Sequence, residues 1–113
     1  MKEIHWMGDS LDMLGSFPNE VKREMGYALR LAQAGETHEC AKPYKGFPGV
    51  MELVSPFMTD TFRTVYALKV GTRIYVLHAY QKKSNRQGKV PKRDRELIDL
   101  RYKAAKRLEE DNV

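Results

Sequence analysis

Residues 73–84 constrain the fold of this chain more than any other stretch, because an apolar run there gives way abruptly to a cationic end. β-Branched, aromatic and aliphatic residues dominate its first part, which predicts a strand. Apolar residues at consecutive positions indicate that both faces of the strand are at least partly covered. Residues two apart share a face in a regular strand, so one face should be polar and the other should pack. The polar face would carry His78, Tyr80 and Lys82, and the packing face Tyr75, Leu77 and Ala79.

The composition is that of an ordinary globular protein with a basic balance. The chain has 113 residues, of which 42% are hydrophobic and 31% charged, and we expect one domain over residues 1–113. A net charge of +5 favours a polyanionic partner such as nucleic acid, an acidic protein segment or a membrane surface. The alternative is a soluble protein that is basic without such a partner.

The single cysteine, Cys40, fits a reducing compartment, because one thiol makes no internal disulfide. The first six residues lack the apolar run of a signal peptide, and no window approaches the roughly 18 apolar residues of a membrane span. We therefore expect a soluble cytoplasmic protein that does not associate with the membrane.

Hydrophobic periodicity, prolines and glycines predict the remaining elements. The expected strands cover residues 2–6, 50–55, 61–69 and 73–84, and the expected helices cover residues 11–14, 18–34 and 91–110. Loops are expected over residues 36–48 and 85–89. The order β-α-α-β-β-β-α predicts an α+β fold, a small antiparallel sheet with helices packed mainly on one side. The apolar residues of the last helix lie on one of its faces; they are Leu97, Leu100, Ala104 and Leu108.

The strands expected over residues 50–55, 61–69 and 73–84 should form a three-stranded antiparallel meander. The densest positive segment begins at the end of the third of these strands and runs into the last helix. It comprises Lys82, Lys83, Arg86, Lys89, Lys92, Arg93 and Arg95. Single-stranded RNA fits such a segment, with phosphates on the cations and bases stacked on aromatic rings. The candidate rings are Tyr44, Tyr66 and Tyr80. The alternative for each cation is a solvated surface residue.

Arg63 and His78 are candidate catalytic residues. An arginine on a sheet face needs a partner or water, and its planar group suits a phosphate. The alternative is a salt bridge to Glu52 in the neighbouring strand. A histidine free in solution titrates near neutral pH, which makes His78 a candidate general acid or base, although a histidine in a strand is more often a hydrogen-bonded structural residue. No metal site is expected, because Cys40 and His38 have no second pair of ligands.

A basic site can cleave RNA without a metal or another cofactor. The 2′-hydroxyl of the substrate attacks the adjacent phosphate, while the protein orients the strand, transfers two protons and stabilises the added charge. The residues expected to fill these roles are Arg63, His78, Tyr80 and Lys82. DNA lacks the 2′-hydroxyl and would not be cut.

Four stretches, in this order, resemble the RelE/HigB-like superfamily of bacterial toxins and specifically its phage-derived HigB-like subgroup. They are KGFPGVMEL at residues 45–53, FRTVY at 62–66, VLHAYQKKS at 76–84 and a proline-led helix from Pro91. The resemblance implies the toxin of a type II toxin–antitoxin pair, a ribosome-dependent mRNA endonuclease that needs no metal and is neutralised by a helix-turn-helix antitoxin.

The resemblance also implies roles for individual residues. The family arginine of the second meander strand matches Arg63, and the basic residue before the first meander strand matches Lys45. The basic and aromatic residues that close the third strand match Tyr80, Lys82 and Lys83. Some members place a catalytic tyrosine or histidine after this strand, where this chain has a long helix, so the general base stays open between His78 and Lys82.

Two other functions remain open. The related ParE-like toxins share the fold but bind DNA gyrase and cut no RNA. A basic accessory protein of a phage would bind nucleic acid without toxicity. If the chain is an RNA endonuclease, the residues expected to bind RNA are Lys45, Tyr66, Lys83, Arg86, Lys89 and Arg93.

Overall fold

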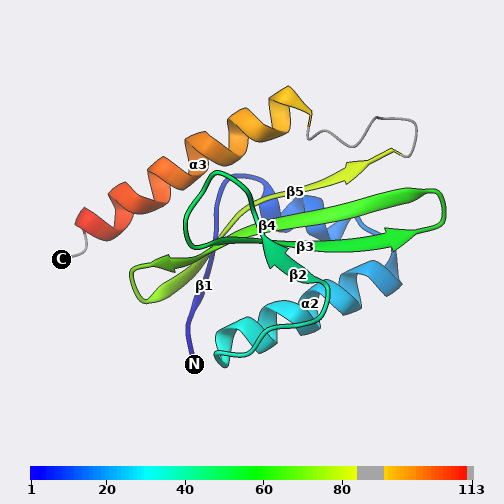
Figure 1. Ribbon diagram of the computed structural model, residues 1–113, viewed down its shortest axis with the longest axis horizontal. Helices are drawn as coiled ribbons and strands as arrows, with labels where there is room; N and C mark the ends of the chain where they lie inside the picture. Colours follow the sequence, from blue (N-terminus) through cyan, green and yellow to red (C-terminus); the bar gives the residue numbers. More distant parts are fainter. Residues whose placement is uncertain (84–90, 112–113) are drawn as a thin grey trace.

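A five-stranded sheet runs through the computed structural model, which describes residues 1–83 and 91–111 (Figure 1). The elements follow the order β1 (Ile4–Trp6), α1 (Ser10–Gly15), α2 (Asn19–Gln33), β2 (Ala41–Pro43), β3 (Val50–Phe57), β4 (Asp60–Val70), β5 (Arg73–Lys82) and α3 (Lys92–Asp111). Across the sheet the strands are ordered β1-β5-β4-β3-β2. The α+β class predicted from the sequence is therefore confirmed.

The expected meander is present, but both edges of the sheet differ from the expectation. Strands β3, β4 and β5 pair antiparallel in sequence order. At one edge β1 pairs parallel with β5, so the expectation of a purely antiparallel sheet is wrong. At the other edge β2 pairs with β3 inside the segment that was expected to be a loop. A strand this short, ending in proline, gives little periodic signal and is tolerated at an edge.

Helices cover both faces of the sheet, which corrects the expected one-sided arrangement. Helix α2 places Val21, Met25 and Ala28 in the core on one face. Helix α3 places Ile98 and Ala105 in a second core on the opposite face, as the separation of the two helices in Figure 1 shows. The physical reason is that β4 and β5 carry apolar side chains on both faces, and each face must be removed from water.

The buried stripe of α3 is not its leucine-rich face. Ile98 and Ala105 are fully buried, whereas Leu100 keeps 64% and Leu108 keeps 39% of its surface exposed. Two apolar stripes follow helical periodicity along this helix, and periodicity does not say which one meets the sheet. Arg101 contacts Leu77 and His78 of the sheet, so its polar contacts form on the same side of α3 as the buried stripe.

A bulge in β5 changes which side chains share a face. Val65 pairs with His78 and Tyr66 pairs with Val76, so Leu77 is an extra residue on β5. Tyr75 and Leu77 consequently belong to the core under α3, whereas Ala79 belongs to the core under α2. The expectation that Tyr75, Leu77 and Ala79 share one face, opposite His78, is therefore wrong.

None of the helices in the described part of the chain combines the length and the apolar character needed to cross a membrane.

Candidate functional site

Three neighbouring strands deliver polar side chains to the face of the sheet that α3 partly covers. Arg63 on β4 lies opposite Tyr80 on β5, and Thr61 lies opposite Lys82 one step further along the same pair. On the other side of β4, Glu52 of β3 lies opposite Val65. Alternation along β4 and β5 therefore brings Glu52, Arg63, Tyr80 and Lys82 to one face. We call these four residues the central cluster.

A carboxylate lies at the centre of this cluster and holds two cations. Arg63 donates from Nη1 to both oxygens of Glu52, at 3.2 and 3.3 Å. Lys42 of β2 lies 3.5 Å from Oε1 of the same carboxylate. The salt bridge between Arg63 and Glu52, which the sequence left as an alternative, is thus present. Because Nε of Arg63 is buried without a hydrogen-bond partner among the described residues, the guanidinium retains donor capacity for a second anion.

Lys82 ends β5 with its side chain almost completely withdrawn from water, at 6% exposure. Burial, followed by the positive charge of Arg63, lowers the pKa of its ammonium group, while the carboxylate of Glu52 acts in the opposite direction. A lysine of lowered pKa gives up its proton more readily than an exposed lysine and suits proton transfer. Lys82 lies on the same face of the sheet as Arg63 and Glu52, so the three charged residues belong to one site.

Tyr80 is equally enclosed, at 3% exposure, and its hydroxyl lacks a hydrogen-bond partner among the described residues. Burial raises the pKa of this phenol far above its ordinary value, and the positive charge of Arg63 only partly opposes that effect. The group therefore keeps its proton at physiological pH. In this site Tyr80 is suited to donate a hydrogen bond or a proton, not to act as a base.

His78 lies next to the central cluster but both of its ring nitrogens are occupied. Nε2 lies 2.6 Å from Oδ1 of Asp94, and Nη1 of Arg101 donates to Nδ1 at 3.1 Å. An arginine only donates, so Nδ1 is the acceptor and Nε2 carries the hydrogen that reaches Asp94. The ring also stacks on Tyr80, with centroids 5.3 Å apart and planes at 18°. This geometry favours a positioning role over general acid or base chemistry.

The contacts of His78 belong to a polar network that fastens α3 to the sheet. Besides His78, Arg101 donates to the carbonyl of Leu77 at 3.1 Å and to Oδ1 of Asp9 at 3.0 Å. Gly8 makes room for this guanidinium, since a Cβ at Gly8 would lie 2.6 Å from Arg101 Cζ. Asp9, Asp94 and Arg101 were absent from the sequence-based prediction. Asp94 and Arg101 lie on the same helix, α3, but no local spacing connects them with Asp9, because 92 positions separate Asp9 from Arg101.

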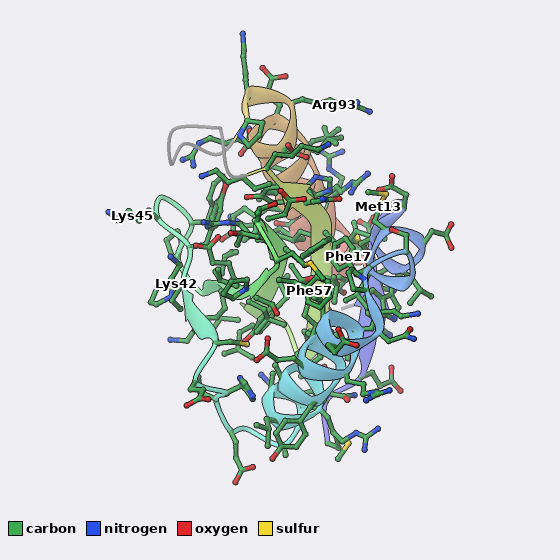
Figure 2. All side chains as sticks on the ribbon, turned by 90° about the vertical axis from the view of Figure 1, so that its right-hand side faces the viewer. Met13, Phe17, Lys42, Lys45, Phe57 and Arg93 are labelled. Atoms are coloured by element: carbon green, nitrogen blue, oxygen red, sulfur yellow. The ribbon has the colours of Figure 1, made fainter. Side chains whose placement is uncertain are left out.

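The remaining predicted cations surround the cluster from different sides. Lys83 and Arg93 line a cleft of about 520 Å³ between the end of β5, α1 and the start of α3, together with His78 and Tyr80. Lys45 belongs to the exposed segment after β2. In the end-on view of Figure 2, Lys42 and Lys45 point to one side of the molecule, whereas Arg93 extends from α3 toward the other. The structure therefore does not join Lys45 and Arg93 into one contiguous patch.

Tyr66 does not belong to this face. Its side chain is 2% exposed and packs in the core beneath α2, on the side of the sheet opposite Arg63. The prediction that Tyr66 contacts RNA is therefore corrected, because a ring sealed in the core offers no surface to a base. Arg86 and Lys89 lie outside the described residues.

Glu52 entered the sequence-based prediction only as a partner of Arg63, yet it is the acidic centre of the site. The available signal was a charged residue at an otherwise apolar position of a predicted strand.

Tyr44, which was expected only as one of several stacking rings, lies close enough for the charges of Glu52 and Arg63 to influence the pKa of its phenol. Burial has the largest effect and raises that pKa.

Comparison with known proteins yields one match. Residues 12–103 match the family described as "Phage derived protein Gp49-like (DUF891)". No curated protein and no solved structure matches the chain. The matched range begins in α1 and ends in α3, so it includes every strand of the meander and the whole central cluster.

Proposed function

From the premise that this chain belongs to the Gp49-like family of phage-derived proteins, a RelE/HigB-like toxin family, we propose that it is the toxin of a type II toxin–antitoxin pair, of the HigB-like subgroup. In this proposal it acts in the cytoplasm as a ribosome-dependent endonuclease that cuts mRNA. The observation that carries the proposal is one face of the sheet on which Arg63 binds the carboxylate of Glu52 beside the buried Lys82 and Tyr80, whose hydroxyl has no hydrogen-bond partner among the described residues.

The proposed reaction is an internal transfer within the RNA. A base removes the proton from a 2′-hydroxyl, the 2′-oxygen forms a bond to the adjacent phosphorus, and the bond from phosphorus to the 5′-oxygen breaks. The products are a 2′,3′-cyclic phosphate and a 5′-hydroxyl, which receives a proton from the protein. No oxidant, reductant or cofactor enters this balance.

The chemistry of the cluster suggests how these tasks are divided. Arg63 and Lys82 supply positive charge for the phosphorane, and Nε of Arg63, which has no hydrogen-bond partner among the described residues, is a further donor for phosphate. Tyr80 keeps its proton and donates to the leaving or non-bridging oxygen. The carboxylate of Glu52 is the proton acceptor, and it becomes available when the RNA phosphate takes its place on the guanidinium of Arg63. Neutral Lys82 is the alternative acceptor.

His78 has a supporting role in this proposal. Its two ring nitrogens are held by Asp94 and Arg101, and its ring stacks on Tyr80. We therefore place His78 behind the reacting groups, where it fixes the orientation of the phenol.

Reconstituted translation tests the proposal. Purified protein is added to ribosomes translating a defined mRNA, and new 5′ ends are mapped by primer extension. Ends within the codon of the ribosomal A site, lost in Lys82→Met and retained in Arg23→Ala, are the expected result. Arg23 is the matched control because it is an exposed cation on α2, on the opposite side of the sheet.

Two other results would replace the proposal. Intact mRNA together with DNA damage and growth arrest in cells would indicate a ParE-like inhibitor of gyrase. Intact mRNA without toxicity would indicate a nucleic-acid-binding accessory protein. The proposed partner is a helix-turn-helix antitoxin that covers the central cluster, and a neighbouring gene product that fails to co-purify would count against that part.

A further inference from the structure

A second pocket lies beside the central cluster, at the start of α3. It encloses about 370 Å³ and is lined by Phe47, Lys92, Arg95, Glu96 and Asp99. The volume falls at the small end of the roughly 300–1,000 Å³ found for ligand sites. One wall is aromatic and comes from the segment before β3, and the other is charged and comes from the first two turns of α3.

The aromatic wall includes a guanidinium stacked on two rings. Cζ of Arg95 lies 5.7 Å from the centroid of Tyr44 and 5.6 Å from that of Phe47. The two rings lie 5.5 Å apart at 36° to each other. Behind them Tyr102 of α3 meets Phe47 edge-on, with centroids 5.4 Å apart. A ring and a guanidinium arranged in this way form a stacking surface for a planar group.

The segment that carries Phe47 is held in place by hydrogen bonds. Tyr44 N donates to Val50 O at 2.9 Å, and the hydroxyl of Tyr102 donates to the carbonyl of Pro48 at 3.3 Å. Gly46 has a φ of +92°, and a Cβ there would lie 3.0 Å from Nη2 of Arg95. Glycine thus allows both the backbone conformation and the close approach of the guanidinium. The stacking surface is therefore formed before any ligand arrives.

The charged wall offers acceptors next to this surface. Glu96 lies 3.9 Å from Lys92, and Asp99 lies 3.1 Å from Lys103, so within residues 1–83 and 91–111 each carboxylate has one ion-pair partner and keeps further lone pairs. Carboxylates accept hydrogen bonds from exocyclic amino groups of nucleobases. Uracil has no exocyclic amino group, and the two carbonyl oxygens on either side of its N3–H would face the carboxylates unfavourably.

We propose that this pocket binds a nucleobase that carries an exocyclic amino group, stacked against Phe47 and Arg95 with its amino group directed to Glu96 and Asp99. The cytosine, adenine and guanine bases satisfy this description, and uracil does not. The pocket is a binding site outside the central cluster, and its residues are selectivity determinants that take no part in bond cleavage.

The position of Tyr44 connects the pocket to the proposed cleavage site. One side of Tyr44 faces Arg95, whose Nη1 lies 3.5 Å from the phenol oxygen. Tyr44 also belongs to the same buried cluster as Tyr80, and Lys42, two residues before Tyr44, lies 3.5 Å from Oε1 of Glu52. A base in the pocket therefore belongs to a nucleotide near the scissile phosphate. This part of the inference rests on the proposed function, whereas base binding itself does not.

Titration with mononucleotides tests the pocket without any cleavage. The ¹⁵N-labelled protein is titrated by NMR with 5′-CMP, 5′-AMP, 5′-GMP and 5′-UMP, and amide shifts in residues 44–50 and 92–99 are followed. We expect at least one amino-bearing nucleotide to bind about tenfold more tightly than 5′-UMP, which is the lower part of the discrimination given by a well-placed base contact. Phe47→Leu should weaken that binding about tenfold, and the double variant Glu96→Gln, Asp99→Asn should abolish the preference.

Matched controls separate this inference from the proposed function. Phe57→Leu changes another half-buried phenylalanine, at the β3–β4 end labelled in Figure 2, and should leave nucleotide binding unchanged. Lys82→Met should lose cleavage and retain base preference. Three results would overturn the inference even if the ribosome assay shows cleavage. They are equal affinity for all four nucleotides, no detectable binding at nucleotide concentrations of about 10 mM, and unchanged nucleotide binding in Phe47→Leu.

Discussion

Glu52 holds Arg63 through a single guanidinium nitrogen, with Nη1 shared between the two carboxylate oxygens at 3.2 and 3.3 Å. An arginine paired in the parallel two-nitrogen manner would instead donate to the carboxylate from two different nitrogens. Here Nε has no partner among the described residues. The carboxylate therefore orients the guanidinium and leaves one of its N–H donors without a partner in the described part of the chain.

The first prediction concerns this pair. Arg63→Ala should lower the free energy of unfolding by about 3 kcal/mol, because in the described part of the chain it leaves Lys42 as the sole ion-pair partner of the buried Glu52. The double variant Glu52→Gln, Arg63→Met should recover much of that stability and still lose at least about 10²-fold in cleavage rate. Urea denaturation and primer extension measure the two effects. A stable double variant that cleaves normally would exclude the pair from the reaction.

The second prediction concerns the buried ammonium group of Lys82. Lys82→Met should raise the free energy of unfolding at pH 7 by about 1 kcal/mol, because a buried charge is replaced by an apolar side chain of similar length. The same variant should lose cleavage activity. Stability and function are thus expected to move in opposite directions at this position, and a variant that is both less stable and fully active would contradict the assignment.

The pH dependence of stability provides the third prediction. In the folded protein the pKa of Lys82 lies below the ordinary value of 10.5. Between these two pKa values the unfolded chain binds more protons, so this residue makes the free energy of unfolding rise with pH across that window. The advantage of Lys82→Met over the parent should therefore shrink as pH approaches 10.5. Denaturation of both proteins at pH values from 7 upward checks the sign.

The fourth prediction separates positioning from chemistry in the network behind the site. Arg101→Lys should lower the free energy of unfolding by about 2 kcal/mol, because one ammonium cannot reproduce the contacts to Leu77, His78 and Asp9. Arg107→Lys, at an exposed position of the same helix, should change it by less than about 0.5 kcal/mol. Cleavage per folded molecule should stay within a few-fold of the parent for both.

The fifth prediction uses two glycines. Gly8→Ala should be destabilising by about 1–3 kcal/mol, since Gly8 has a φ of +53° and its Cβ would contact the guanidinium of Arg101. Gly26→Ala, on α2 with nothing within 4 Å of the added Cβ, should instead be stabilising by about 0.5–1 kcal/mol. Thermal denaturation of the two variants beside the parent gives the comparison, and equal shifts would exclude the proposed close approach.

Local patterns were sufficient for most elements because each depends on neighbouring residues. The stripe of Val21, Met25, Ala28 and Ala32 predicted α2, and β-branched and aromatic runs predicted the meander. The salt bridge of Arg63 to Glu52 also followed from strands that are adjacent in sequence. These inferences need no information beyond periodicity and short connections.

The features that the sequence did not reveal depend on contacts between residues that lie far apart in the chain. The parallel pairing of β1 with β5 joins residues about 70 positions apart, Ile4 with Ile74. The burial of Ile98 in place of Leu100 was undetermined because α3 offers two apolar stripes. The nucleobase pocket needs the segment around Phe47 to reach α3, and nothing in the local spacing of either segment specifies that contact.

The additional residue in β5 has a consequence for how the site can tolerate sequence change. Val76 faces α2, so an uninterrupted alternation from there would turn Tyr80 and Lys82 toward the α2 core as well. The insertion at Leu77 shifts the remainder of the strand by half a period, and only for that reason does the ammonium of Lys82 stand beside Arg63. Deleting one residue here would preserve every functional side chain in the sequence and still direct them to the wrong side of the sheet.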